Sequence, residues 1–237
     1  MAAIVLRVEG ERRLYDLEIG IDLHRMKPQP PSYADDSSLS LSIPLIGYRS
    51  VNAGLHLITV SHGDCYRVGL FVECSENDLV VLKWDPHLEE VIPVVGTKED
   101  TERLHDALRR GELDRWLFSY STDQQGVQAW QSITTHINAR LLNHTGIKLG
   151  ACIGTSYEEK PHWSALKPTS KEGLRQLGAS SASSGGEWWG KLLEWAIANS
   201  FKGDESLLIG ELELAWVCFI QVLLPPEECL ERWKDIV

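Results

Sequence analysis

Residues 55–84 read LHLITVSHGDCYRVGLFVECSENDLVVLKW. Three runs rich in β-branched and aliphatic residues, 55–60, 66–73 and 79–84, alternate in this stretch with two short polar connectors. The connectors contain Ser, Gly, Asn and Asp, which favour tight turns. Short apolar runs at this spacing, separated by turn residues, are typical of an antiparallel all-β unit. The stretch therefore predicts three consecutive strands.

The same pattern extends to both sides of this stretch. Residues 2–8 and 14–21 form two further runs of β-branched and aliphatic residues, and residues 91–95 follow the last of the three. Residues 27–42 break the pattern with three prolines and a cluster of Ser and Asp, so we expect a long surface loop there. The first hundred residues therefore predict a β-rich unit.

After Gly96 the periodicity changes from that of strands to that of helices. Thr97-x-x-Asp100 resembles a capping box and predicts a helix at about 98–117. A second helix is predicted at about 125–142, because apolar residues recur there at spacings of three and four. These residues are Val127, Trp130, Ile133, Ile137 and Leu141.

The last part of the chain combines an irregular stretch with apolar helices. Residues 151–186 are irregular and end in the Ser/Gly-rich tract 178–186, which has the composition of a linker. Residues 207–224 are almost wholly apolar, and a helix that is apolar nearly all round must be buried on several sides. Pro225 and Pro226 then predict a stop and a final helix.

These observations predict an α+β fold. We expect residues 1–150 to form an antiparallel β-sandwich-like domain with appended helices. We expect residues 151–186 to be a linker and residues 187–237 to form an all-α domain. Three helices with this much apolar surface make a thin domain by themselves. The all-α domain is therefore expected to be incomplete, as in a short or C-terminally truncated form.

Charge and composition exclude several classes of partner. The 237 residues include 23 Lys and Arg against 34 Asp and Glu, a net charge of -11. Nucleic-acid binding and electrostatic anchoring to a membrane both require clustered positive charge, so neither is expected. No stretch approaches the roughly 20 apolar residues that span a bilayer. The five cysteines are odd in number and irregularly spaced, which favours a reducing compartment.

The sequence offers no credible catalytic or metal-binding constellation. Ser61, His62 and Asp64 are nearly consecutive, whereas triad residues must converge from separate elements. His62-x-x-Cys65 with Cys74 lacks the second ligand pair of a structural zinc site. We therefore predict no catalytic residue, metal or cofactor. One alternative is a small hydrolase-type enzyme in which His56 or His62 meets Asp64 and a cysteine in a cleft.

Nine tryptophans are an unusual number for this length. Most are expected in the core, and four fall on apolar helix stripes: Trp130, Trp195, Trp216 and Trp233. Tryptophan is also enriched at protein-interface hot spots. Trp163 and Trp188 lie near the Ser/Gly-rich tract 178–186 and are our first candidates for contact with a partner.

Two groups of motifs resemble a known family. The first group is Gly20-Ile21-Asp22, Gly54-Leu-His56, Arg67-Val-Gly69-Leu-Phe71 and Leu82-Lys-Trp84-Asp85. The second is Gly210-Glu211-Leu-Glu213-Leu-Ala-Trp216 followed by Leu230-Glu-Arg232-Trp233. In order and approximate spacing they are similar to the A-1 cistron-splicing factor family. The chain departs from the family pattern at Asn52-Ala53, where prolines are usual, and at Glu213 and Trp216, which replace Gln and Phe.

The resemblance implies a non-enzymatic role in pre-mRNA splicing. Family members are assembly chaperones of the U-5 small nuclear ribonucleoprotein. They bind the RNase H-like and Jab/MPN-like domains of pre-mRNA-processing-splicing factor 8 and block premature binding of a helicase. The resemblance adds Trp84 and Arg67 as candidate partner-binding residues. It implies residence in the cytoplasm and nucleus and a chain that is monomeric before binding. The remaining alternative is an interaction module unrelated to splicing.

Overall fold

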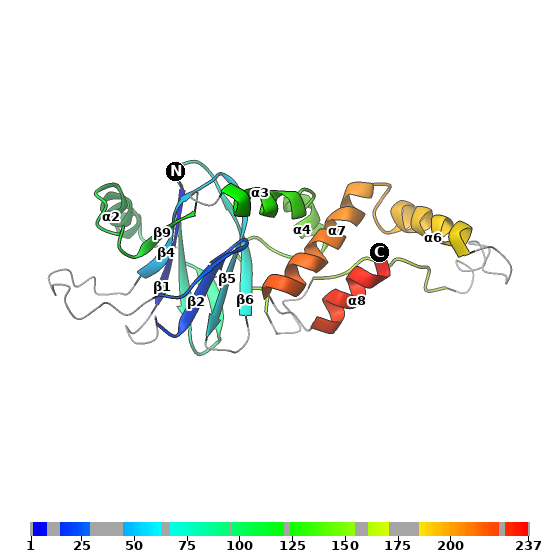
Figure 1. Cartoon of the computed structure of the whole chain (residues 1–237), viewed down its shortest axis with the longest axis horizontal. Helices are drawn as coiled ribbons and strands as arrows, with labels where there is room; N and C mark the ends of the chain where they lie inside the picture. Colours follow the sequence, from blue (N-terminus) through cyan, green and yellow to red (C-terminus); the bar gives the residue numbers. More distant parts are fainter. Residues whose placement is uncertain are drawn as a thin grey trace.

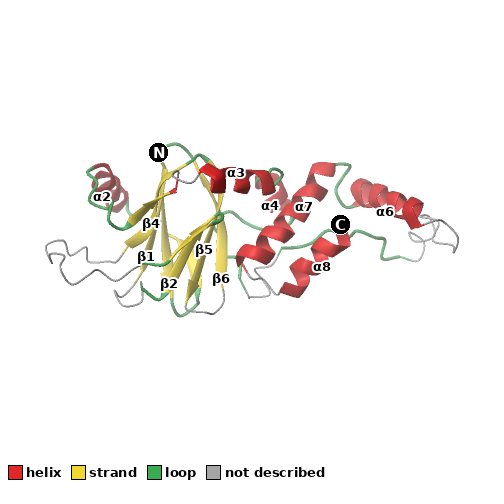
Figure 2. Ribbon diagram, in the orientation of Figure 1, coloured by secondary structure: helices red, strands yellow, loops and turns green. Residues whose placement is uncertain are grey.

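The computed structural model describes residues 2–8, 15–28, 45–62, 67–94, 96–120, 124–154, 161–170, 185–222 and 226–236. Two β-sheets lie against each other, and helices extend from them along the long axis of the molecule (Figure 1). Figure 2 shows the same division, with strands gathered on one side and most helices on the other. The α+β fold class predicted from the sequence is confirmed.

The first sheet has five strands in the order β8-β7-β1-β4-β9. It is mixed, because β1 pairs in parallel with β7 and β4 pairs in parallel with β9, whereas we expected antiparallel strands only. The strands are β1 (Ala2–Val8), β4 (Leu45–Val51), β7 (Leu79–Asp85), β8 (Glu90–Pro93) and β9 (Leu117–Ser119). The central strand β1 is buried along almost its whole length, as is typical of a strand covered on both faces.

The second sheet is antiparallel, with the order β3-β2-β5-β6. Its strands are β2 (Leu17–Ile21), β3 (His24–Met26), β5 (Gly54–His62) and β6 (Arg67–Cys74). Alternate residues of β1, such as Ile4 and Leu6, pack with Ile19, Ile58 and Leu70 in the core between the sheets. This period of two is what the pleat of a strand dictates.

Helices cover the outer face of each sheet. The described α-helices are α2 (Lys98–Arg109), α3 (Gln124–Ile133), α4 (Ala139–His144), α6 (Gly185–Asn199), α7 (Glu205–Val217) and α8 (Pro226–Ile236). Val5 of β1 packs with Leu104 of α2 on the outer side of the first sheet. Leu57 and Phe71, from the outer side of the second sheet, share a core with residues of α4 and α7 such as Leu214. The helical part is therefore joined to the second sheet through common buried side chains.

Two arginines strengthen this junction through hydrogen bonds to residues that follow α7. Arg25 of β3 donates hydrogen bonds to the Ile220 carbonyl (3.1 Å) and to Oε1 of Gln221 (2.8 Å). Arg67 of β6 donates to the Gln221 carbonyl (3.3 Å). Both acceptor residues belong to a π-helical segment, Cys218–Val222, that continues α7. The arginines thus satisfy carbonyl groups near the end of a helix, where partners within the helix run out.

The six strands expected from the sequence are confirmed, but β3, β4 and β9 were missed. The predicted helix at 98–117 is shorter, and its Thr97 cap is confirmed because the Thr97 side chain accepts from the backbone of Asp100. The expected surface loop at 27–42 and the Ser/Gly-rich tract at 178–186 lie largely outside the described residues.

The single helix expected at 125–142 is broken into α3 and α4. Thr134 and Thr135 donate their hydroxyl protons to the Trp130 and Gln131 carbonyls, and such side chains compete with helix continuation. Asn138 then caps α4 by accepting from the backbone of Leu141 (3.0 Å). In the described part of the chain, every helix is too short or too polar to cross a membrane.

Candidate functional site

A buried carboxylate, Asp22, connects three separated parts of the chain. It follows β2 and is 1% exposed. Nδ1 of His56 donates to its Oδ2 at 2.7 Å, and the Tyr120 hydroxyl donates to the same oxygen at 2.6 Å. The backbone N–H of Leu57 donates to Oδ1 at 3.0 Å. One residue therefore fixes the end of β2 against β5 and against the residue after β9.

The backbone around Asp22 explains why glycine and aspartate occur there. Asp22 has a φ of 56°, in the left-handed region that aspartate tolerates better than most residues. A Cβ on Gly20 would lie 2.3 Å from Oγ1 of Thr59 on the paired strand. The Gly-Ile-Asp motif is therefore required by close packing and by a tight turn.

His56 is held as a charged donor rather than as a base. Its Nε2 donates to the Asn52 carbonyl (2.9 Å), while Nδ1 donates to Asp22, so both ring nitrogens are used as donors. Burial alone lowers the pKa of His56, but the hydrogen bond and charge of Asp22 and the Asn52 carbonyl outweigh it, and the pKa is raised. Burial and Asp22 raise the pKa of Tyr120, which therefore stays neutral.

A second buried carboxylate, Glu211, organises the helical part. It lies on α7 with no exposed surface and pairs with the guanidinium of Arg232 on α8. The Ser164 hydroxyl donates to it at 2.5 Å, and Nε2 of His144 lies 2.8 Å from that hydroxyl. The neighbouring Gly210 has no room for a Cβ, which would be 3.0 Å from the His136 carbonyl. Gly210 therefore lets α7 lie close to the His136 carbonyl, and Glu211 links α7 to α8.

Residues 34–146 match the family model described as the AAR2 N-terminal domain. This match supports the membership of the A-1 cistron-splicing factor, or AAR2, family that the sequence motifs predict. No curated protein matches its sequence. Members of the AAR2 family are splicing assembly factors without a catalytic role.

The structure gives a physical explanation for the motifs that carry the resemblance. Asp22 of the first motif bonds to His56 of the second, although 34 positions separate them. Glu211 of the late glycine-glutamate motif bonds to Arg232, 21 positions further on. Buried charges are stable only when they are paired and hydrogen-bonded, so each partner requires the other. In this chain these motif residues therefore hold buried contacts of the fold.

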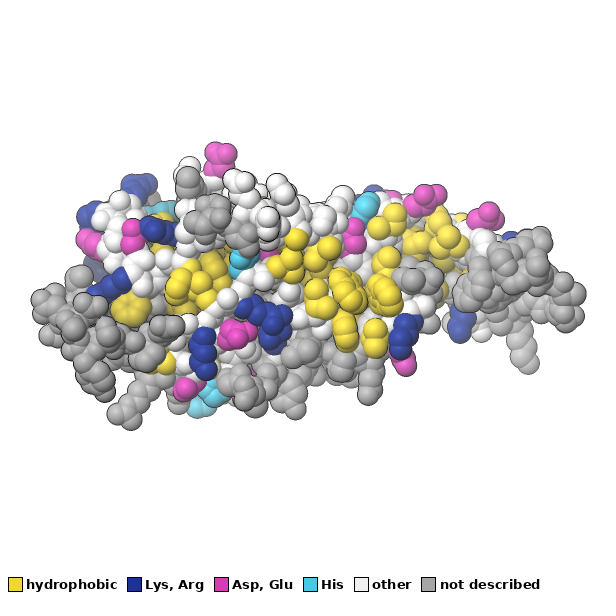
Figure 3. Space-filling view, in the orientation of Figure 1, with side chains coloured by type: hydrophobic (Ala, Val, Ile, Leu, Met, Phe, Trp, Pro, Cys, Tyr) yellow, Lys and Arg dark blue, Asp and Glu magenta, His cyan; other side chains and the backbone are white. Residues whose placement is uncertain are grey.

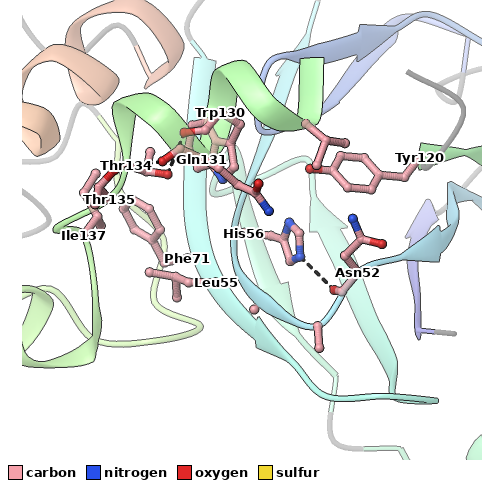
Figure 4. Close-up of a pocket in the computed structure, with 13 residues that line it drawn as sticks. Asn52, Leu55, His56, Phe71, Tyr120, Trp130, Gln131, Thr134, Thr135 and Ile137 are labelled. Atoms are coloured by element: carbon pink, nitrogen blue, oxygen red, sulfur yellow. Dashed lines mark hydrogen bonds between the residues drawn. The ribbon is translucent and has the colours of Figure 1, made fainter. Parts of the chain in front are cut away.

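A pocket of about 260 Å³ lies beside His56, between the start of β5 and α3 (Figure 4). Its wall includes His56 and Tyr120, which both donate hydrogen bonds to Asp22. Apolar lining residues are Leu55, Phe71, Val127, Trp130 and Ile137. Polar lining residues are Asn52, Gln131, Thr134 and Thr135. The pocket thus lies where the hydrogen-bond network of Asp22, His56 and Tyr120 meets the surface.

The four predicted partner-binding residues have different environments. Trp84 is 4% exposed in the core between the sheets, so contact with a partner would require it to leave that core. Trp163 is half-buried, with the Arg232 guanidinium 6.0 Å from its ring centre. Arg67 is engaged with Gln221 and lies 3.7 Å from Glu18. The side chain of Trp188 lies outside the described residues.

An exposed aromatic cluster on α7 and α8 was missed by the sequence analysis. Trp216, expected in the core, is 37% exposed, and its ring centre lies 6.0 Å from Phe219 and 5.7 Å from Trp233. Ile209, two turns earlier on α7, is 42% exposed. Figure 3 shows hydrophobic side chains gathered over this region. We call Trp216, Phe219 and Trp233 the aromatic cluster.

The hydrolase-type arrangement is not formed by the described residues. His56 has no free lone pair, and Asp64 and Cys65 lie outside the described part of the chain. Burial raises the pKa of Cys74 to about 11 and raises that of Cys218 well above its usual range, opposite to what a nucleophilic thiol needs. No three described His, Cys, Asp or Glu side chains gather as a metal ion would require.

Proposed function

We propose that this chain is an assembly chaperone of the U-5 small nuclear ribonucleoprotein. In this proposal it binds the RNase H-like and Jab/MPN-like domains of pre-mRNA-processing-splicing factor 8, referred to below as the scaffold. It thereby delays binding of the helicase. The observation that carries the proposal is the match of residues 34–146 to the model of the AAR2 N-terminal domain. Residence in both the cytoplasm and the nucleus belongs to the same proposal, and cell fractionation tests it.

The chemistry of the site supports action by binding. His56, whose pKa is raised, donates from both ring nitrogens and cannot accept a proton in this arrangement. The aromatic cluster offers exposed apolar area of the kind that protein interfaces use, since tryptophan is enriched at interface hot spots. We assign the cluster to the contact with the scaffold.

The test is co-elution of the full chain with a purified scaffold fragment that contains both domains. We expect a single complex at micromolar concentration, and we expect the helicase to bind that complex less than it binds the scaffold fragment alone. Absence of a complex, with a folded chain, contradicts the proposal and favours an interaction module unrelated to splicing.

A pair of variants tests the assigned contact. Trp216→Ser changes the aromatic cluster, and Leu88→Ser changes an isolated leucine that is 63% exposed in the turn between β7 and β8. We expect Trp216→Ser alone to weaken binding, by tenfold or more. Equal affinities of both variants for the scaffold fragment would show that the aromatic cluster is not part of the contact. The proposed function would then be decided by the co-elution experiment.

A further inference from the structure

The pocket beside His56 has a floor and a rim of different chemistry. Its floor is apolar, with Phe71 fully buried and Trp130 only 4% exposed. Its rim carries the exposed side chains of Asn52 on one side and Gln131 and Thr135 on the other. Figure 4 shows these groups coming from two elements, the segment before β5 and the end of α3, so the pocket spans the junction between them.

The size of the pocket limits what it can hold. Its volume of about 260 Å³ lies below the range of about 300–1,000 Å³ that is usual for sites of cofactors and drug-sized ligands. A dinucleotide or a haem is therefore too large. One aromatic side chain fits this scale, and such a side chain carries a large apolar area into a single contact.

Charge further limits the occupant. No Asp, Glu, Lys or Arg is among the described residues that line the pocket, although the whole chain has a net charge of -11. The one charged group in the wall, His56, is matched by the carboxylate of Asp22 behind it. An ionised group entering the pocket would lose its hydration without gaining a partner, which is strongly unfavourable. The occupant is therefore uncharged.

The rim also requires a hydrogen-bonding group on the occupant. The carboxamides of Asn52 and Gln131 have no hydrogen-bond partner among the described residues. Each can donate and accept. A tyrosine hydroxyl or an indole N–H at the mouth would satisfy one of them while the ring filled the apolar floor. Leucine or phenylalanine would cover the same carboxamides without replacing the water bound to them.

The loop on one side of the pocket leaves an open approach. Gly54 has a φ of 138°, and nothing lies within 4 Å of the position that a Cβ would occupy there. Ala53 beside it is exposed. A partner backbone can therefore pass over this loop and place one side chain into the pocket.

We propose that this pocket is an anchor site that takes one uncharged aromatic side chain with a polar tip, tyrosine or tryptophan, from a partner protein. The side chain enters past Ala53, lies on Phe71 and Trp130, and hydrogen-bonds to Asn52 or Gln131. The site is separate from the aromatic cluster. Only the second of the two tests below rests on the proposed function.

The first test uses small probes and two matched variants of the full chain. Ala53→Trp fills the mouth of the pocket, and Ala129→Trp makes the same change at an exposed position of α3 that does not line it. N-acetyl-tyrosinamide and N-acetyl-tryptophanamide are titrated into nitrogen-15-labelled protein. We expect saturable shifts of the Asn52 and Gln131 side-chain amide signals in wild type and Ala129→Trp, and none in Ala53→Trp.

The charged probe N-acetyl-aspartate amide serves as the chemical control and should give no such shifts. The proposal is overturned if the aromatic probes leave these signals unmoved in wild type, if Ala53→Trp responds as wild type does, or if the charged probe binds equally well. Signals of Asn52 and Gln131 are identified by their loss in Asn52→Asp and Gln131→Glu.

The second test measures affinity for the scaffold fragment with the same two variants. We expect Ala53→Trp to bind at least tenfold more weakly than wild type and Ala129→Trp to bind equally well. If both variants bind as wild type does, the scaffold does not use the pocket, which contradicts the anchor role while the proposed function stands. If wild type itself does not bind, the proposed function fails and the probe titration alone decides the inference.

Discussion

At the scale of single residues, Asp22 lies in a turn but holds together distant parts of the chain. It accepts three hydrogen bonds while almost completely buried. An unpaired buried charge is costly, so the donors around Asp22 are as necessary as the carboxylate itself. Tyr120, 98 positions away, donates its hydroxyl proton to this carboxylate.

Replacing Asp22 by Asn should destabilise the chain strongly. Asparagine tolerates the left-handed backbone at this position, so the change removes the charge and one strong acceptor without straining the turn. We expect a loss of about 3–5 kcal/mol in the free energy of unfolding, the range for breaking a buried charged pair. Urea denaturation measures it. The control Asp16→Asn, at an exposed position, should stay within about 0.5 kcal/mol of wild type.

The charge on His56 predicts how stability depends on pH. The pKa of His56 is raised in the folded chain by Asp22 and the Asn52 carbonyl despite burial, so the pair stabilises fully below the ordinary value of about 6.5. Stability should then fall as pH rises through the raised pKa. Wild type should therefore lose more unfolding free energy than His56→Gln as pH rises above about 6.5. Parallel curves for the two proteins would contradict the charged state of His56.

At the scale of elements, strands were easier to predict than their pairing. The β-branched and aliphatic residues of a run such as Ala2–Val8 predict a buried strand. Nothing in the run indicates that its parallel neighbour is Leu79–Asp85, because pairing depends on contacts between distant residues. The short edge strands β3 and β9 have three residues each, too few to show a period.

The same limit explains why the exposed aromatic cluster was not anticipated. Residues of α7 are apolar nearly all round, so the sequence shows no stripe that separates a buried face from an exposed one. The structure buries Leu214 and Val217 and leaves Trp216 outside. The pocket could not be predicted either, because its lining comes from four separated parts of the chain: residues 52–56, Phe71, Tyr120 and six residues between 127 and 137.

Trp216 and Trp130 should respond differently to the same substitution. Trp216 is 37% exposed and Trp130 is 4% exposed. We expect Trp216→Ala to lower the free energy of unfolding by about 1–2 kcal/mol and Trp130→Ala by about 3–5 kcal/mol, the range for a fully buried aromatic residue. Thermal and urea unfolding compare the two. A larger loss at Trp216 would place its ring in the core.

At the scale of the whole molecule, the boundary expected at residue 150 divides a shared core. Leu57 and Phe71 of the second sheet pack with Leu214 of α7. Ile153, just beyond the boundary, exchanges two backbone hydrogen bonds with Gly69 of β6, at 2.8 and 2.6 Å. The core between the two sheets, in contrast, is built almost entirely from residues before 121.

Two fragments test how far the N-terminal part is independent. We expect fragment 1–150 to fold, because it contains the core between the sheets, but to melt below the full chain since Phe71 loses its cover. Fragment 1–154 should melt at a higher temperature than 1–150, because it regains the pairing of Ile153 with Gly69. A spectrum of an unfolded chain for both fragments would show that the helical part is required for folding.

The central place of β1 in its sheet has a consequence during protein synthesis. Residues 2–8 are synthesised well before their parallel neighbour, residues 79–85. At about 5–20 residues per second, the interval is on the order of ten seconds. During that time one of the most apolar segments of the chain has at best a single neighbour. The yield of soluble protein should therefore depend on how quickly the codons for residues 9–78 are translated, as well as on the amino acids themselves.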